Sequence, residues 1–344
     1  MIRLPWPLTL MPLMSSAANY SASKIGVDAT EVIVLADAAR KTEVRIAPSI
    51  GNNAYSMKMN GIEVLWSPNQ TLAEWKAKPA QIGNPFLAPW ANRLDQDAFF
   101  ANGKKYLLNP GLKNFRYDAT GKPIHGLLVY ASQWRVVSLK ADEGGAETTS
   151  RLEFWREPDW MAQFPFAHSI EMTYRLRDGA LEVETAVENL SSQPMPLSLA
   201  FHTYYRIADA PRDDWTVTLP ARERVVLSDA LVPTGERKPV EFASPLALRD
   251  ATLDDVFTSL AADAAGRAEF RVRGKRQSIA VTQGPKYPVS VVYAPPGRDF
   301  ICFEPMTGVT NAFNLAHEGK YPELQTVAPG RIWRESYWIR PEGY

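Results

Sequence analysis

One histidine and one glutamate stand where an apolar strand pattern turns polar, and both side chains can move protons. His202 lies in Leu-Ala-Phe-His-Thr-Tyr-Tyr, where buried alternation changes to polar and aromatic residues. A histidine at a strand end can donate a proton into a cleft, because its charge changes near neutral pH. Glu304 continues the apolar run 300–303. Burial there raises its pKa and makes it a better base. The alternative is a strand-end glutamate that pairs with an arginine.

Two further segments could recognise a ligand. Arg93 follows Asn92 in NPFLAPWANRL, where two prolines stiffen the chain, and guanidinium and amide groups on a rigid backbone suit hydroxyl and ring-oxygen recognition. His125 lies in Pro-Ile-His-Gly-Leu, where Gly126 allows close approach of a backbone or a ligand. His125 is either a hydrogen-bonded turn residue or a ligand contact. His168 and His317 are expected to be packing and surface residues.

Composition and motifs exclude several classes of function. Lys plus Arg and Asp plus Glu both number 38, so no net field draws the protein to nucleic acid or an anionic membrane. The lone Cys302 rules out an internal disulfide and a cysteine-rich zinc site. Glycine-rich nucleotide loops, HExxH and GxSxG are all missing from the sequence. A neutral small molecule is therefore the expected partner.

Short β patterns position these residues. Period-two alternation, as in LEVET at 181–185, predicts strands with one buried face. The separators include Asp178-Gly179 and Asn102-Gly103, which are hairpin turn signals. Only Thr71 to Ala77 has a helical pattern, and residues 140–150 are expected to form a flexible surface loop. The pattern predicts an all-β fold, a large antiparallel β-sandwich.

The N-terminus is expected to lie outside this sandwich. Residues 1–18 combine Arg3, an apolar stretch interrupted by two prolines, and small residues that loosely resemble a cleavage site. We therefore expect a leader at 1–21, disordered or signal-like, and one domain at 22–344. The protein is expected to be cytoplasmic, or periplasmic or secreted if the leader is a signal peptide. No apolar run is long enough to span a bilayer.

Taken together, the segments resemble the aldose 1-epimerase (galactose mutarotase) family from about residue 24 to the C-terminus. Six blocks in the family's order carry the resemblance. They are NPFLAPWANRL with FFANGKKYLLN, PIHGLL, DGALEVETAVENLSSQPMPLSLAFHTYY, TLDDVF, FICFEPMTGVTNAFN and VAPGRIWRESYWI. The resemblance implies a supersandwich fold and an isomerase that interconverts the α and β anomers of a free hexose without cofactor or metal.

The resemblance also implies the roles of individual residues. Glu304 resembles the general base that removes the anomeric proton, and His202 the general acid that protonates the ring oxygen. The sugar-hydroxyl ligands implied are Asn92, Arg93, His125 and Asp254. A one-residue slip would put Asp255 in place of Asp254.

Two alternatives remain open. His202-Thr203-Tyr204-Tyr205 is closer to the hexose-6-phosphate epimerase branch, and the loop at 294–299 lacks the glutamine of galactose-specific members. A phosphorylated hexose would need two or more converging cations, such as Arg93 with Arg206 or Arg298. The other alternative is a carbohydrate-binding protein without catalysis, which would have no need for a histidine–glutamate pair. A sugar is the expected partner, with neither nucleic acid nor membrane, and no oligomeric state is predicted.

Overall fold

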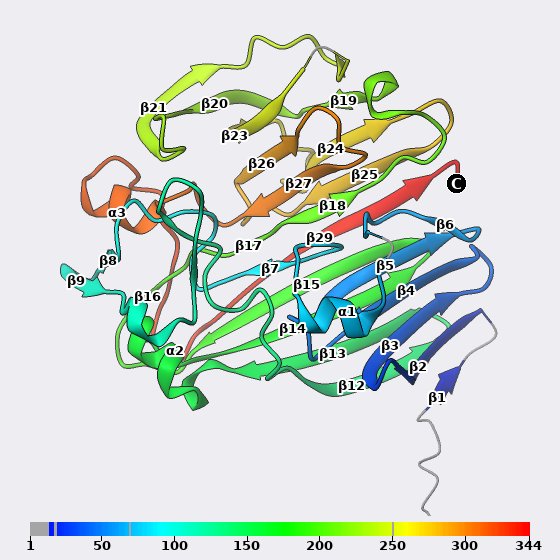
Figure 1. Cartoon of the computed structure of the whole chain (residues 1–344), viewed down its shortest axis with the longest axis horizontal. Coiled ribbons are helices and arrows are strands. Elements are labelled where there is room, and N and C mark those ends of the chain that lie inside the picture. Colours follow the sequence, from blue (N-terminus) through cyan, green and yellow to red (C-terminus); the bar gives the residue numbers. More distant parts are fainter. Residues whose placement is uncertain (1–13, 17–18, 69, 250) are drawn as a thin grey trace, which may run out of the picture.

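A six-stranded sheet forms the N-terminal part of the computed structural model, which describes residues 14–16, 19–68, 70–249 and 251–344 (Figure 1). Each strand pairs antiparallel with the next along the chain. The strands are β1 (Met14–Ser16), β2 (Tyr20–Val27), β3 (Thr30–Asp37), β4 (Thr42–Ala47), β5 (Asn53–Met59) and β6 (Ile62–Glu63).

This sheet begins earlier than expected. β1 and the start of β2 fall within residues 1–21, which sequence analysis assigned to a leader, and Ser16 is paired with Ser21. Residues 14–16 and 20–21 thus belong to the sheet although they precede the predicted boundary at 22, because β1 pairs antiparallel with the edge of β2. Residues 1–13 and 17–18 lie outside the described residues, and with them most of the predicted signal-like segment.

A nine-stranded sheet forms the second layer, and its long strands carry the clearest alternation. In β15 (Ala180–Asn189), Leu181, Val183 and Thr185 are fully buried. The Asp178-Gly179 turn that precedes β15 has the positive φ expected of a hairpin turn. In spatial order the other strands are β12 (Arg135–Asp142), β13 (Gly145–Glu153) and β14 (His168–Arg177) before β15, then β29 (Ile332–Glu342), β25 (Ser278–Gln283), β24 (Ala268–Arg273), β19 (Thr216–Thr218) and β22 (Leu246–Ala247).

The third sheet contains the strands that carry His202 and Glu304. Its order is β21 (Pro233–Pro239), β20 (Ala221–Leu227), β23 (Leu253–Leu260), β26 (Val289–Ala294), β27 (Ile301–Met306), β17 (Ala200–Phe201) and β7 (Phe86–Leu87). A further strand, β18 (Thr203–Tyr205), also pairs with β27. Three two-stranded ribbons lie outside these sheets: β8 (Ala98–Ala101) with β9 (Lys104–Leu107), β10 (Arg116–Tyr117) with β11 (Pro123–Ile124), and β16 (Met195–Pro196) with β28 (Thr326–Val327).

The first and third sheets join edge to edge. A β-bridge links Leu65 to Tyr205, and the backbone N–H of Trp66 donates to the carbonyl of Tyr204 at 2.9 Å. One apolar core takes residues from all three sheets, among them Leu35, Tyr174 and Phe303. Figure 1 shows the two joined sheets in front of the long strands of the nine-stranded sheet. The predicted antiparallel β-sandwich is therefore confirmed.

Three short helices connect the strands. The predicted helix at 71–77 is α1 (Leu72–Ala77), which begins with a capping box between Thr71 and Glu74. Sequence analysis missed α2 (Pro158–Gln163) and α3 (Ala312–His317), which are equally short but lack the side-chain cap that marks the start of α1. Among the described residues, no helix has the length and apolarity needed to cross a membrane.

The prediction of a flexible loop at 140–150 was wrong. Residues 140–142 end β12 and 145–150 begin β13, and the two strands form a tight hairpin with Asp142 opposite Gly145. Thr148 is fully buried, and β13 continues into the sheet by pairing with β14. The small and polar residues that indicated a loop therefore form a strand, because their alternate side chains are buried.

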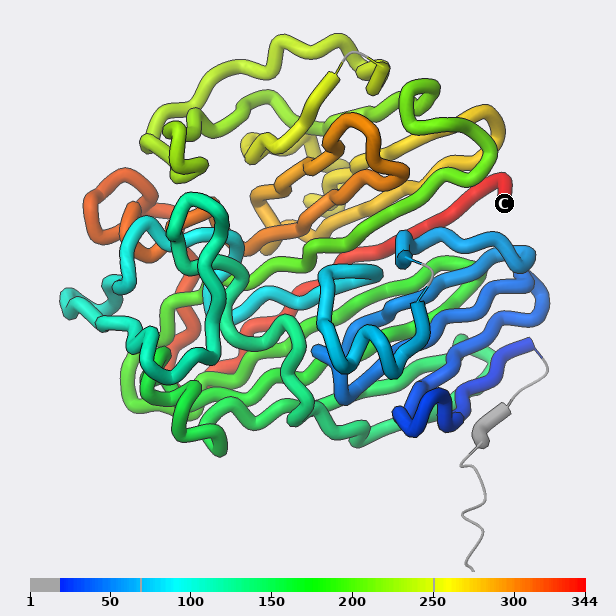
Figure 2. The backbone as a smooth tube through the Cα atoms, viewed as in Figure 1, coloured from blue at the N-terminus to red at the C-terminus, as the bar shows by residue number. Residues whose placement is uncertain are grey.

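The segment from residue 88 to 126 leaves the third sheet after β7 and returns beside it, where Ala88 forms a β-bridge with Gly126. Figure 2 shows this segment, in cyan to teal, beside the orange-red α3. The two are joined by hydrogen bonds, including one from the Asn314 side-chain amide to Asp95 at 2.6 Å. The segment thereby comes back to the end of β27, where Glu304 lies.

Candidate active site

The register of three paired strands places a row of side chains on one face of the third sheet. Residues opposite one another on paired strands point to the same face, and the faces alternate along each strand. Cys302 on β27 lies opposite Tyr293 on β26, which lies opposite Asp254 on β23. Glu304, two positions beyond Cys302, shares this face. Asp255 points to the other face, where it pairs with Arg224 at 3.5 Å, so Asp254 is the aspartate beside Glu304.

His202 reaches Glu304 from the neighbouring chain segment. It lies between β17 and β18, both of which pair with β27, and its backbone N–H donates to the carbonyl of Pro85 at 2.9 Å. Nε2 of His202 lies 3.3 Å from Oε1 of Glu304. Nδ1 of the histidine and Oε2 of the glutamate are buried and have no hydrogen-bond partner in the described part of the chain. Each of these two atoms therefore keeps a hydrogen-bonding capacity that a bound molecule could use.

Two residues in left-handed backbone conformation build the opposite wall. Asn92 has φ of 52° and His125 has φ of 66°, and the backbone N–H of His125 donates to the carbonyl of Asn92 at 2.8 Å. Gly126 follows, and a Cβ at that position would lie 2.1 Å from the carbonyl oxygen of Ala88. The glycine thus permits the close backbone approach that holds this wall together, as its place in the sequence suggested.

Arg93 is fixed by two oxygen acceptors. Its Nε donates to Oδ2 of Asp118 at 2.5 Å, and its Nη1 donates to Oδ1 of Asn92 at 3.0 Å. Burial opposes ionisation of Asp118, but hydrogen bonds from Arg93, Lys122 and Thr120 outweigh it and hold the pKa of the carboxyl well below its usual range. The positive charge of Arg93 also favours the ionised forms of Glu304 and Asp254.

Burial dominates the electrostatics of the acid–base pair. It raises the pKa of Glu304 well above its usual value, and the charge of Asp254 adds to this rise. It lowers the pKa of His202 to about 3, and the nearby charges of Arg116 and Arg93 act in the same direction. The pair therefore holds one proton over a wide pH range. It can take a proton from one oxygen of a ligand and deliver a proton to another.

One group of side chains within the described ranges could offer three ligand atoms to a metal. These atoms of His202, Cys302 and Glu304 lie within 4.8 Å of one another. Burial raises the pKa of the Cys302 thiol well above its usual value, and the other two residues, His202 and Glu304, already contact each other at 3.3 Å. Acid–base chemistry by the histidine and glutamate is the use that this geometry favours.

A family comparison agrees with this arrangement. The model of the aldose 1-epimerase family matches residues 32–340. The chain belongs to the aldose 1-epimerase family. The matched range covers both walls of the site and contains all six site residues that were predicted from the sequence.

Solved structures of the family share the fold. A galactose mutarotase-like protein from Clostridium acetobutylicum superposes with a TM-score of 0.84 at 21% identity, covering 95% of this chain and all of that one. Galactose 1-epimerase from Lactobacillus acidophilus gives 0.72 at 13% identity, covering 98% and 100%. An aldose epimerase homologue from C. elegans gives 0.69 at 18% identity, covering 88% and 96%. At these identities the likeness establishes the mutarotase fold.

All six predicted site residues of this aldose 1-epimerase family member come together. His202 contacts Glu304, and its ring meets that of His125 edge to face with centroids 5.4 Å apart. The backbone N–H of His125 donates to the carbonyl of Asn92. The positive charge of Arg93 lowers the pKa of Glu304 and of Asp254. Sequence analysis missed three further polar residues, Gln81, Arg116 and Asp118, because each lies in a loop or short ribbon where no apolar pattern is interrupted.

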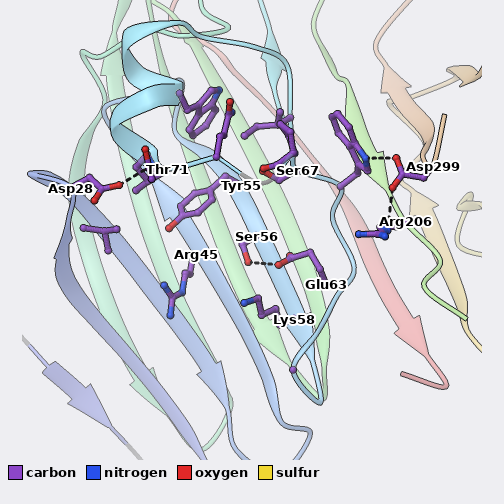
Figure 3. Close-up of a pocket in the computed structure, with 18 residues that line it drawn as sticks. Asp28, Arg45, Tyr55, Ser56, Lys58, Glu63, Ser67, Thr71, Arg206 and Asp299 are labelled. Atoms are coloured by element: carbon purple, nitrogen blue, oxygen red, sulfur yellow. Dashed lines mark hydrogen bonds and ion pairs between the residues drawn. The ribbon is translucent and has the colours of Figure 1, made fainter.

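A separate cavity of about 780 Å³ lies beside the site (Figure 3). Trp66 forms the boundary: its ring packs on Tyr204, which in turn stacks on His202. On the cavity side the indole N–H of Trp66 donates to Asp299 at 2.7 Å, and Asp299 pairs with Arg206 at 3.5 Å. Arg206 therefore faces this cavity, in a largely exposed pair with Asp299.

Proposed function

We propose that this protein is an aldose 1-epimerase that interconverts the α and β anomers of a free hexose. The observation that carries the proposal is the buried contact of 3.3 Å between His202 and Glu304. Ring opening of a cyclic hemiacetal needs one group to take the anomeric proton and a second to protonate the ring oxygen. Each such group contributes roughly 10² to 10⁴ in rate. The pair supplies both functions, Glu304 from β27 and His202 from the link between β17 and β18.

In the proposed reaction, Glu304 removes the proton from the anomeric hydroxyl. The electrons of the O–H bond form the carbonyl, while the C1–O5 bonding pair moves to O5, which takes a proton from His202. The open-chain aldehyde then rotates about the C1–C2 bond. Closure on the other face of the carbonyl returns each proton, with Glu304 as acid and His202 as base. Every atom and electron is conserved, so the step needs no cofactor.

The opposite wall, together with Asp254 on the face that carries Glu304, is proposed to hold the sugar. Asn92, Arg93, His125 and Asp254 combine donors and acceptors at fixed positions, which suits the hydroxyl groups of a hexose. Arg93 is preorganised by Asp118 and Asn92, so little side-chain freedom is lost when a sugar binds. These interactions form with both anomers and with the open chain, so they contribute to binding in each state.

Ion pairing of the candidate arginines supports a free hexose rather than a phosphorylated one. Arg93 pairs with Asp118, and Arg206 pairs with Asp299. Only Arg298, of the three arginines considered, makes no ion pair within the described residues, whereas binding of a phosphate dianion favours several convergent cations. A carbohydrate-binding protein without catalysis would not require a buried carboxyl beside a histidine, because burying an unpaired polar group lowers stability.

Polarimetry tests this proposal directly. Fresh α-glucose should mutarotate faster with the protein than without it, and glucose 6-phosphate should be the poorer substrate. Glu304→Gln and His202→Asn should each lower kcat by on the order of 10² to 10⁴. Glu63→Gln is a matched control, because Glu63 is also a carboxyl whose pKa burial raises but belongs to the separate cavity. Wild-type turnover by Glu304→Gln would refute the mechanism, and inactivity on every free aldose would refute the function.

A further inference from the structure

The ring of His125 is held by two side chains that also hold each other. Nδ1 of His125 lies 2.5 Å from Nη2 of Arg116 and 2.9 Å from Nε2 of Gln81. The same Nη2 of Arg116 donates to Oε1 of Gln81 at 2.6 Å. The three side chains form a closed triangle of hydrogen bonds at one edge of the site.

The chemistry of this triangle determines where each hydrogen lies. A guanidinium has only donors, so both of its partners must accept. The amide of Gln81 therefore turns its oxygen toward Arg116 and its NH₂ group toward the histidine ring. Both contacts at Nδ1 of His125 then bring a hydrogen to that nitrogen. A ring nitrogen that already carries a proton cannot accept, so Nδ1 is bare and the ring proton is on Nε2.

Nε2 of His125 is left as an uncommitted donor. No described residue makes a hydrogen bond to it, and the ring lies edge to face against His202. Burial keeps the ring neutral by lowering the pKa of His125 well below its usual value, and the charges of His202, Arg116 and Arg93 add to this. A neutral histidine with bare Nδ1 presents one N–H and nothing else.

We propose that Arg116 and Gln81 are positioning residues that keep His125 in the Nε2–H form, so that it donates a hydrogen bond to an oxygen of the bound sugar. This inference rests on the proposed function. A fixed donor is needed here because Glu304, once its proton has passed to His202, and ionised Asp254 can only accept. The ring oxygen of a hexose and the carbonyl oxygen of its open chain can likewise only accept, so neither could bind a bare nitrogen.

Nitrogen NMR tests the tautomer without any activity measurement. The chain has four histidines, so ¹⁵N-histidine labelling gives few signals, and His125→Asn identifies the signals of His125. In the wild type we expect a bare Nδ1 and a protonated Nε2. The double variant Gln81→Glu, Arg116→Met removes both donors and offers Nδ1 an acceptor, so we expect the proton to move to Nδ1. Arg249→Met, an exposed arginine paired with Asp214, is the matched control and should leave the tautomer unchanged.

Kinetics then link the tautomer to sugar binding. The double variant should raise KM about tenfold with a smaller change in kcat, as expected for an interaction made in the ground and transition states alike. Arg116→Lys keeps a donor and should restore both the tautomer and KM. The inference is overturned if wild-type His125 carries its proton on Nδ1, or if the tautomer does not change in the folded double variant. If His125 has the expected tautomer but the protein epimerises no sugar, the proposed function is refuted, while the positioning of His125 by Arg116 and Gln81 stands.

Discussion

Nε2 of His202 lies 3.3 Å from Oε1 of Glu304, and the second polar atom of each side chain has no partner among the described residues. A proton shared across this contact belongs to the pair rather than to either residue. Burial favours the form in which both side chains are neutral, with the proton on Glu304. In the proposed mechanism, transfer of that proton to His202 produces the carboxylate and imidazolium that start ring opening, without any exchange with solvent.

The first prediction concerns the pH dependence of catalysis. Activity needs the pair to hold one proton, so kcat/KM should fall on the acidic side only when a second proton binds His202, whose pKa is lowered to about 3. On the basic side it should fall when Glu304 loses its proton, at a pKa well above the usual one. Polarimetry across the pH range, with circular dichroism to detect acid unfolding, should show a broad plateau. A break near pH 6.5, about the value of a free histidine, would show that the pair is not coupled in this way.

The second prediction concerns stability. The pKa of Glu304 is raised in the folded state, so the folded protein binds more protons than the unfolded one above the carboxyl's unfolded pKa. Stability contributed by this group is present below the unfolded pKa and is lost as pH rises through the folded pKa. Glu304→Gln should therefore unfold at a higher temperature than wild type at pH 8, and the difference should vanish near pH 4.

Thermal unfolding at both pH values is the measurement for this second prediction. The exposed Glu241→Gln serves as the control, and it should show no such pH-dependent gain. Equal unfolding temperatures for Glu304→Gln and wild type at pH 8 would contradict the assigned burial of an ionisable Glu304.

The third prediction concerns Arg93. Arg93→Lys keeps the positive charge but cannot contact Asp118 and Asn92 in the fixed geometry of the guanidinium. KM for the sugar should rise about tenfold, with a smaller effect on kcat, because the interaction is made in the ground and transition states alike. Steady-state kinetics by polarimetry provide the measurement. Arg237→Lys, which alters an exposed pair with Glu323, is the control. An unchanged KM in Arg93→Lys would exclude a role in binding.

The fourth prediction concerns Gly126. A methyl group there would collide with the carbonyl of Ala88, and φ of 65° is unfavourable for alanine. Gly126→Ala should lower the free energy of unfolding by about 3 kcal/mol. Gly121→Ala is the control, because φ is 75° but nothing lies within 4 Å of the added Cβ, and it should lose only about 1 to 2 kcal/mol. Urea unfolding of both variants gives the comparison, and equal losses would mean that the close approach to Ala88 contributes nothing.

The residues that sequence analysis could identify share one property. His202 and Glu304 each end an apolar run with an ionisable group, and this conflict between burial and charge is visible in the local sequence. Asp254 and Asp255 show what a local pattern leaves undecided: both are polar, and only the register between β23 and β26 separates the face that carries Glu304 from the face that carries Arg224.

Other features depend on contacts between distant segments. Gln81 and Arg116 are separated by 35 positions and meet only because the chain returns to His125 along the β10–β11 ribbon. The hairpin at 140–150 was mistaken for a loop because Glu143 and Gly144 form the turn and Gly145 follows it, while Thr148 is buried only once β13 pairs with β14. Tertiary pairing, rather than local preference, decides such segments.

The pairing of β27 with both β17 and β18 has a consequence for how this fold can change over time. Glu304 lies on β27 and His202 between β17 and β18, whereas Asn92, Arg93 and His125 lie in the segment between residues 88 and 126. Under the proposed function, a mutation or insertion in that segment would alter contacts to the sugar hydroxyl groups, while strand pairing keeps the spacing of the acid–base pair. Asp254, on β23 of the same sheet as Glu304, would stay in place with the pair.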